Sequence, residues 1–288
     1  MRRLIINADD FGLTGGVNRA IIECHRAGSV TSTTLMANSD EFASAVDLAC
    51  AYPKLGVGCH VMLVDGAPLS PPEQVSSLLV PGEQVFRSSA ADFARAAIRR
   101  QLNSEHIASE ATAQIRKLQD AGVKVTHFDT HKHTHVFPVA LKALLGVAKE
   151  LGIRAVRNPF GSLDVATSIA LAQRPRLWLR HFQMKVLGCY SGGFTRALKE
   201  AGLRTTDGTF GILATGSFDE NMFRTILDAI PDGTWELVCH PGYNDASLAN
   251  IKTRLRGSRV LEREVLTMPQ VRDEIRQRGI ELISFADL

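Results

Sequence analysis

Cysteine is scarce in this sequence and is not arranged for cross-linking. Five cysteines occur among 288 residues, an odd number with no Cys-x-x-Cys spacing. They are Cys24, Cys50, Cys59, Cys189 and Cys239. This pattern excludes a disulfide framework and indicates a reducing compartment. We predict that Cys59 and Cys239, each directly before a histidine, are small core residues on strands.

Long apolar runs are also missing. No stretch approaches the roughly 20 apolar residues of a membrane-spanning helix. The apolar run at residues 4–6 is followed closely by Asp9 and is too short for the apolar region of a signal peptide. We therefore expect a cytoplasmic protein.

The charges are nearly balanced. There are 33 Lys and Arg against 30 Asp and Glu, a formal net charge of +3, and no long basic stretch occurs. This argues against a nucleic-acid partner. The hydrophobic content of 45% is ordinary for a globular protein. Without an internal repeat, a low-complexity tract or a convincing linker, we expect one domain over residues 1–288.

Short apolar runs alternate with amphipathic stretches along the chain. The predicted strands are 3–8, 29–37, 56–63, 123–129, 153–157, 208–214, 235–239 and 280–285. The predicted helices are 16–27, 41–51, 90–121, 138–151, 218–229 and 260–278. This alternation predicts an α/β protein with a parallel sheet. So many units in 288 residues favour an irregular (β/α) TIM-like barrel, with an open doubly wound sheet as the alternative.

Carboxylates and imidazoles stand at the ends of four predicted strands. They are Asp9 and Asp10, His60, the tract from Asp129 to His135, and His240. Because the carboxyl ends of parallel strands gather at one rim of a barrel, we expect these side chains to converge. A structural cap needs at most one acid, so two adjacent acids favour a cation, a proton transfer, or both.

Two imidazoles and a carboxylate suit a divalent metal with positions left open for water and substrate. We predict that Asp10, His60 and His131 are the ligands, with the later histidines of the same tract as alternatives to His131. Asp129 is placed to orient one ligand from behind. Nitrogen-rich ligation favours Zn²⁺, and Mg²⁺ is the alternative.

Two polar residues are left for catalysis. Asp9 would lie beside the metal as a free carboxylate, suited to take a proton from a water molecule. His240 would face it as a candidate acid for the leaving group. A site that only binds would not need the second acid.

Four blocks of the sequence, NADDFGLT, GVGCHVML, HFDTHKHTH and LVCHPGY, resemble in order and spacing the YdjC-like family of carbohydrate deacetylases. The resemblance implies a metal-dependent amidase with an irregular (β/α) barrel that removes acetyl groups from N-acetylated sugars. By position, it implies that the metal ligands are Asp10, His60 and His131. It also implies that Asp9 is the catalytic base and His240 the general acid.

Two stretches resemble one branch of that family. Family members often read Asp-Ser-His-His-His where this chain has Thr130 and Lys132 in Asp-Thr-His-Lys-His, and CHVMLVDGAPLSPPEQVSSLLV departs from the chitooligosaccharide-type members. Both resemble the branch associated with hopanoid biosynthesis (HpnK-like), which implies an N-acetylglucosaminyl hopanoid as substrate. The alternatives are a chitooligosaccharide-type deacetylase, a metal-dependent phosphoesterase, and a non-catalytic sugar- or lipid-binding protein.

Residues 160–200 fit the barrel pattern poorly. They combine apolar bulk, including Trp178 and Phe182, with cations such as Arg176 and Arg180. We expect the apolar residues to pack on the barrel as an ordinary helix pair. The alternative is peripheral contact with an anionic membrane that presents a lipid-linked sugar, which this mixture also suits. The expected partners are therefore an N-acetylated sugar or glycolipid. The sequence does not decide between a monomer and a homo-oligomer.

Overall fold

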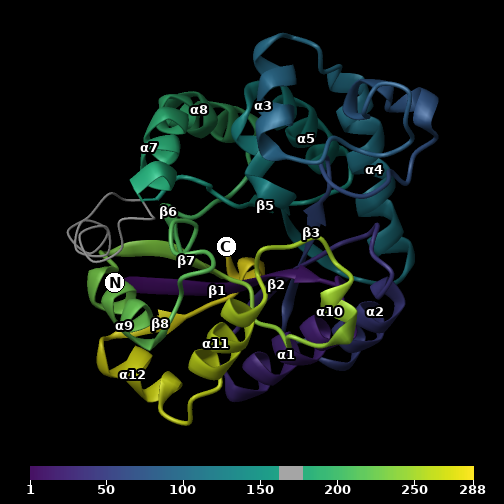
Figure 1. Ribbon diagram of the computed structural model, residues 1–288. Coiled ribbons are helices and arrows are strands. Elements are labelled where there is room, and N and C mark those ends of the chain that lie inside the picture. Colours follow the sequence, from purple (N-terminus) through teal and green to yellow (C-terminus); the bar gives the residue numbers. More distant parts are fainter. Residues whose placement is uncertain (162–177) are drawn as a thin grey trace.

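The computed structural model describes residues 1–161 and 178–288, and its strands form one sheet (Figure 1). The strands are β1 (Arg2–Phe11), β2 (Ser32–Leu35), β3 (Gly56–Val61), β4 (Val125–Thr130), β5 (Ala155–Val156), β6 (Gly208–Phe210), β7 (Gly233–Cys239) and β8 (Ile280–Leu282). Their order is β5-β4-β3-β2-β1-β7-β6, with β8 paired to the beginning of β1, and all of these pairs are parallel.

The sheet curls until the segments at its two ends meet. The backbone N–H of Arg204 donates to the carbonyl of Arg154 at 2.8 Å, and the N–H of Val156 donates back to Arg204 at 3.0 Å. Further along, the N–H of Thr209 in β6 donates to the carbonyl of Phe160 at 3.0 Å. The prediction of an irregular TIM-like α/β barrel is therefore confirmed, in preference to an open doubly wound sheet.

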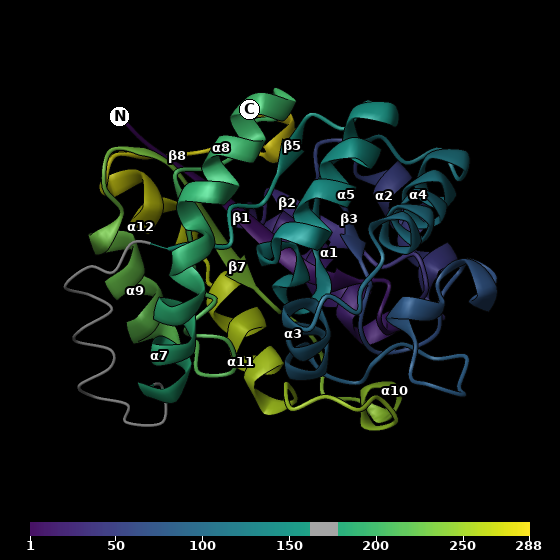
Figure 2. The same cartoon turned by 90° about the horizontal axis from the view of Figure 1, so that it is seen from above.

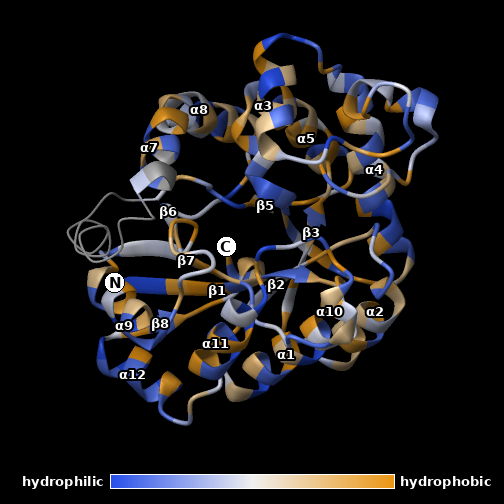
Figure 3. Ribbon diagram, viewed as in Figure 1, coloured by the Kyte–Doolittle hydropathy of each residue, from blue (hydrophilic) through white to orange (hydrophobic). Residues whose placement is uncertain are grey.

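Helices surround the sheet (Figure 1). They are α1 (Gly15–Ala27), α2 (Phe42–Ala51), α3 (Ala90–Ile98), α4 (Ser104–Asp120), α5 (Pro138–Glu150), α7 (Trp178–Leu187), α8 (Ser191–Ala201), α9 (Glu220–Ala229), α10 (Ala246–Ala249), α11 (Gly257–Leu266) and α12 (Val271–Gln277). Hydrophobic and hydrophilic residues alternate along them (Figure 3), as in amphipathic helices packed on a sheet. Helix α1, for example, begins at the N-cap Thr14 and ends at Gly28, which has a left-handed backbone.

The core lies between the sheet and these helices. Leu4, Ile5 and Ile6 of β1 have no exposed surface, and such a continuous apolar run is typical of a parallel strand covered on both faces. All five cysteines are free. Cys59 on β3 and Cys239 on β7 are fully buried, which confirms that they are core residues.

Two predicted helices are each divided in the structure. The region 90–121 forms α3 and α4, because Arg100 takes a φ of +56° and the side chain of Asn103 caps the start of α4. The region 260–278 forms α11 and α12. Pro269 lies between them, and its missing N–H cannot continue a helix.

Two predicted strands are shorter than expected. The region 153–157 contains only two strand residues. The region 208–214 ends as a strand at Phe210, because Gly211 takes a φ of +92° where the chain approaches β7 closely. A Cβ atom on Gly211 would lie 2.2 Å from the carbonyl oxygen of Val238.

The poorly patterned region 160–200 falls only partly within the described residues. Residues 162–177, including Arg176, lie outside them, and α7 and α8 carry the remainder. In Figure 2 the two termini lie at one side of the molecule, whereas α10, α3 and the start of α7 lie at the other. No helix in the described part of the chain is long and apolar enough to cross a membrane.

We expect Gly211→Ala to lower the free energy of unfolding by more than about 2 kcal/mol, since it combines an unfavourable φ with a clash against β7. Gly146→Ala is the control, because a Cβ atom there, on an exposed part of α5, meets nothing within 4 Å. That change should raise the stability by about 0.5–1 kcal/mol. Urea unfolding measures both, and parental stability of Gly211→Ala would contradict the close approach of β6 and β7.

Candidate active site

A bulge in β1 lets two adjacent carboxylates serve one site. In a regular strand, neighbouring side chains point to opposite faces. The pairing of β1 with β2 shifts register between Ala8 and Phe11, and Asp10 has a φ of +67°. Such a bulge re-aims a side chain. Asp9 and Asp10 are both buried at the end of the strand, where each has different partners.

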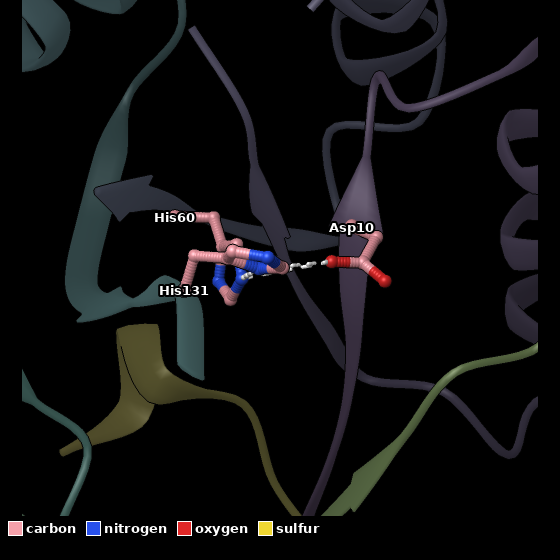
Figure 4. Close-up of side chains that lie close together, drawn as sticks. All are labelled: Asp10, His60 and His131. Atoms are coloured by element: carbon pink, nitrogen blue, oxygen red, sulfur yellow. Dashed lines mark hydrogen bonds and ion pairs between the residues drawn. The ribbon is translucent and has the colours of Figure 1, made fainter. Parts of the chain in front are cut away.

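Asp10, His60 and His131 point toward one another (Figure 4). Oδ1 of Asp10 lies 3.6 Å from Nε2 of His60 and 3.7 Å from Nδ1 of His131. The two nitrogens are 3.2 Å apart. A tetrahedral site with bonds of about 2.1 Å places its ligand atoms about 3.4 Å apart. The three atoms therefore fit a shared cation.

Asp129 orients His60 through the ring nitrogen that does not face Asp10. Its Oδ1 lies 2.7 Å from Nδ1 of the imidazole. With its hydrogen on Nδ1, the ring has Nε2 as the nitrogen left to bind a cation beside the other two candidate ligands. Burial alone would lower the pKa of His60. The charge of Asp129, helped by the two acids of β1, outweighs burial and raises this pKa to about 9.

Asp9 is held by a buried arginine. Nη1 of Arg157 donates to Oδ2 of Asp9 at 2.8 Å, and Nη2 donates to Oδ1 at 2.6 Å. Nδ2 of Asn7 also donates to Oδ1, at 2.9 Å. Burial would raise the pKa of Asp9, but Arg157 prevails and holds that pKa well below its usual range. The carboxylate is therefore ionised at neutral pH.

Arg157 also joins the carboxylates of two other strands. It forms ion pairs with Asp129 of β4 and with Glu236 of β7, and Nε donates to Oε1 of Glu236 at 2.8 Å. Burial raises the pKa of Glu236 to about 7, against the opposing charge of Arg157. Asp9, His60 and Asp129 form a second group close enough to share a cation. The guanidinium of Arg157 already binds both acids of this group, so they are not available to a cation.

Helix α11 supports the site with two more charges. Nη2 of Arg259 pairs with Oδ2 of Asp10, which leaves Oδ1 facing the imidazoles. Burial would raise the pKa of Asp10, but Arg259 helps to hold it well below its usual range. The carboxylate of Glu262 accepts a hydrogen bond from the backbone N–H of His240. Gly242 makes room for this arrangement, since a Cβ atom on it would lie 3.0 Å from Cδ of Arg259.

His240 stands next to Asp9, with its Nε2 at 3.8 Å from Oδ2 of the carboxylate. Burial lowers the pKa of His240 to about 4, although the charges of Asp9 and Asp10 act in the other direction. The resting imidazole is therefore neutral at pH 7. It is able to accept a proton and then to donate it.

Only the first histidine of the tract 131–135 reaches the candidate cation site. Lys132 and His133 take left-handed backbone conformations, which turn the chain after His131. His135 bonds instead to the hydroxyl of Thr130, at 2.7 Å. Burial lowers the pKa of His135 to about 3, as expected for a neutral structural residue.

Four charged residues of the site were missed by the sequence analysis. They are Arg157, Glu236, Arg259 and Glu262. Arg157 and Glu236 carried a readable signal, because each is a charge within or at the end of a predicted buried strand, in IRAVR and in WELVC. The two residues of α11 carried none, since charges on an amphipathic helix are expected to face solvent.

The fold and the site define an α/β barrel with a candidate cation site and a separate acid and imidazole beside it. The chain belongs to the YdjC-like family, whose model, described as YdjC-like protein, matches residues 3–277. It is 32% identical over 287 residues to a carbohydrate deacetylase of Brevibacillus brevis, covering 99% of each chain. It is 30% identical to a chitooligosaccharide deacetylase of Enterobacter sp. strain 638, covering 99% of this chain and 98% of that one.

Solved structures share the fold of this chain. A crystal structure from Enterococcus faecalis V583, of a protein provisionally named for cellobiose-phosphate cleavage, superimposes with a TM-score of 0.79 at 27% identity over 99% of this chain and 98% of that one. A lactam utilization protein of Thermus thermophilus shares the fold, with a TM-score of 0.51 at 16% identity over 98% and 99% of the two chains. The HpnK-like branch stays a prediction.

Arg157→Met tests the buried network. It leaves three buried carboxylates without their cation, so we expect a loss of about 3–5 kcal/mol in the free energy of unfolding at pH 7.5. In the parent, the lowered pKa of Asp9 adds stability that is fully present above its unfolded pKa and is lost only as the pH falls below that value, so this contribution is constant between pH 7.5 and pH 5. Without Arg157 the acids protonate more readily, so the difference between variant and parent should shrink towards pH 5.

Arg116→Met is the control for this experiment, because Arg116 pairs with Glu150 at 3.2 Å on the exposed surface. We expect it to change the stability by at most about 0.5 kcal/mol at either pH. A similar small effect of Arg157→Met in urea unfolding would show that Arg157 does not balance the buried acids.

Proposed function

We propose that this chain is a divalent-metal-dependent hydrolase that removes the N-acetyl group from a carbohydrate. The proposal rests on one observation. The ligand atoms of Asp10, His60 and His131 lie within 3.7 Å of one another, beside an ionised Asp9. Because the site alone does not identify the acyl group, the reaction comes from the deacetylase names of relatives of equal length. Zn²⁺ is the favoured cation and Mg²⁺ the alternative.

Oδ1 of Asp10, Nε2 of His60 and Nδ1 of His131 would hold the cation. The charge of the surroundings supports this role, because the acids that raise the pKa of His60 to about 9 favour positive charge at this position. When bound, a divalent cation would polarise the acetyl carbonyl and make a nearby water molecule more acidic.

Asp9 is the base in this mechanism. Arg157 keeps its carboxylate ionised and fixed, ready to take a proton from the attacking water. The same ion pair makes Asp9 a weak base, so the proton needs a further acceptor. Nε2 of His240, 3.8 Å from Oδ2 of Asp9, is placed to receive it.

His240 then donates this proton to the amine nitrogen as the carbon–nitrogen bond breaks, because an unprotonated amide nitrogen is a very poor leaving group. The proton that water loses thus ends on the amine. The products are acetate and a free amino sugar. A neutral resting His240 is consistent with this order of events.

The rival functions fit the site less well. Metal-dependent phosphoester cleavage commonly uses two cations about 3.5–4 Å apart. In the described part of the chain, the acids of the second group, Asp9 and Asp129, already bind the guanidinium of Arg157 and leave no place for a second cation. A non-catalytic sugar- or lipid-binding protein would not need an ionised acid beside the ligands, which is the place that Asp9 takes.

For the substrate, we further propose an N-acetylated sugar that carries an apolar group, such as the hopanoid that the branch resemblance implies. Trp178, Phe182 and Val186 of α7 support this, since they are 58%, 65% and 54% exposed. Residues four apart lie on one face of a helix. The stripe begins at the side of the molecule where α10 and α3 lie (Figure 2), and it would also serve peripheral contact with a membrane.

Replacing each acid of β1 tests the mechanism. Asp9→Asn should keep the bound metal and lose about 10²–10⁴-fold in the rate of acetate release from an N-acetylated chitooligosaccharide. Asp10→Asn should lose the metal as well as the activity. Metal content by mass spectrometry, together with acetate release, separates the two. If Asp9→Asn also empties the site, Asp9 is a ligand and the assigned roles are wrong.

The double change Trp178→Ser with Phe182→Ser tests the apolar stripe. It should lower kcat/KM for an N-acetylglucosaminyl lipid by at least about 10-fold, since covering a large apolar side chain contributes about 1.5–3 kcal/mol. Activity on a free chitooligosaccharide should not change. Ile98→Ser, at a residue of α3 that is 71% exposed, is the control and should affect neither substrate. If the double change lowered kcat/KM equally for both substrates, the stripe would not bind an apolar group of the substrate.

A further inference from the structure

The second imidazole of the cation site also has a carboxylate behind it. Oδ2 of Asp65 lies 3.4 Å from Nε2 of His131, on the side of the ring away from Asp10. This repeats the arrangement at His60, where Asp129 stands behind the other ring nitrogen. Histidines that bind metals commonly donate their second N–H to a carboxylate, which fixes the tautomer and raises the basicity of the ligand nitrogen.

The loop that carries Asp65 is held in an unusual backbone conformation. Asp65 has a φ of +59° and the following Gly66 a φ of +74°. Such a φ is uncommon outside glycine, although aspartate tolerates it better than most residues. The backbone N–H of Asp65 donates to the carbonyl of Arg87 at 2.9 Å, and the carbonyl of Gly66 accepts from the N–H of Phe86 at 2.9 Å. The turn after β3 is therefore fastened so that the carboxylate faces the site.

Lys132 provides the remaining contact. Its ammonium group forms an ion pair with the same Oδ2 of Asp65 and donates to the carbonyl of Ser88 at 3.3 Å. Both Asp65 and Lys132 are partly exposed, with 31% and 35% of their side chains accessible. Lys132 thus contacts the loop, and Oδ2 of Asp65 faces both the ammonium group of Lys132 and Nε2 of His131.

We propose that Asp65 is a positioning residue for the cation site. Its carboxylate accepts a hydrogen bond from Nε2 of His131, so that Nδ1 keeps its lone pair for the cation beside Asp10. Lys132 pairs with the same carboxylate, but the backbone hydrogen bonds of the loop already hold Asp65 in place, so Lys132 is not required for binding the metal. This inference rests on the metal site of the proposed function and adds a residue to it.

The size of the effect follows from the exposure of Asp65. Loss of a carboxylate behind a metal-binding histidine usually costs 10–100-fold in metal affinity. Because Asp65 is 31% exposed, water screens part of its charge, and we expect about 10-fold, at the lower end of that range.

The test is the affinity of the full-length protein for Zn²⁺, measured by competition with a chromophoric chelator. Asp65→Gly removes the carboxylate without a backbone penalty, since glycine adopts a positive φ freely, and should weaken binding about 10-fold. Asp65→Asn tolerates the same backbone and offers a neutral acceptor, so it should fall between Asp65→Gly and the parent. Lys132→Met is the matched control and should stay within about twofold of the parent.

Two results would overturn the inference. Asp65→Gly could bind Zn²⁺ as tightly as the parent, which would show that the carboxylate does not support His131. Alternatively, Lys132→Met could weaken binding as much as Asp65→Gly. That result would show that the ion pair only holds the loop and that Asp65 does not act through His131. A parent that binds no divalent cation would instead contradict the proposed function itself.

Discussion

The guanidinium of Arg157 is the interaction on which the site depends. It is fully buried and joins Asp9, Asp129 and Glu236, which come from β1, β4 and β7. A buried charge is stable only when it is paired and hydrogen-bonded. Through these contacts one side chain keeps Asp9 ionised and fixes Asp129, which in turn orients His60. The proposed base and one proposed metal ligand therefore depend on the same arginine.

Helix α11 has a comparable function on the other side of β1. Arg259 pairs with one oxygen of Asp10 and leaves the other facing the two imidazoles, while Glu262 accepts a hydrogen bond from the backbone of His240. The bulge in β1 places Asp9 and Asp10 between these two arginines, so that adjacent acids acquire different roles. One acid of the pair is suited to proton transfer and the other to metal binding.

Much of this site could be predicted from the sequence, because parallel strands deliver their carboxyl ends to one rim. That rule alone brought Asp10, His60 and His131 together. It could not supply Arg259, which is 249 positions from Asp10 and lies on an amphipathic helix. Nor could it show that the left-handed backbone at Lys132 turns the later histidines away. The undivided helix expected at 90–121 failed for a similar local reason, the positive φ at Arg100.

In the proposed mechanism, one divalent cation per chain enables hydrolysis of an N-acetyl group. The most direct measurement is a titration of metal-free protein with Zn²⁺ or Mg²⁺ while acetate release from an N-acetylated chitooligosaccharide is followed. We expect no release in the presence of a chelator, and a rate that rises until one cation is bound per chain. Full activity with chelator present, or a rise that ends only at two bound cations, would contradict it.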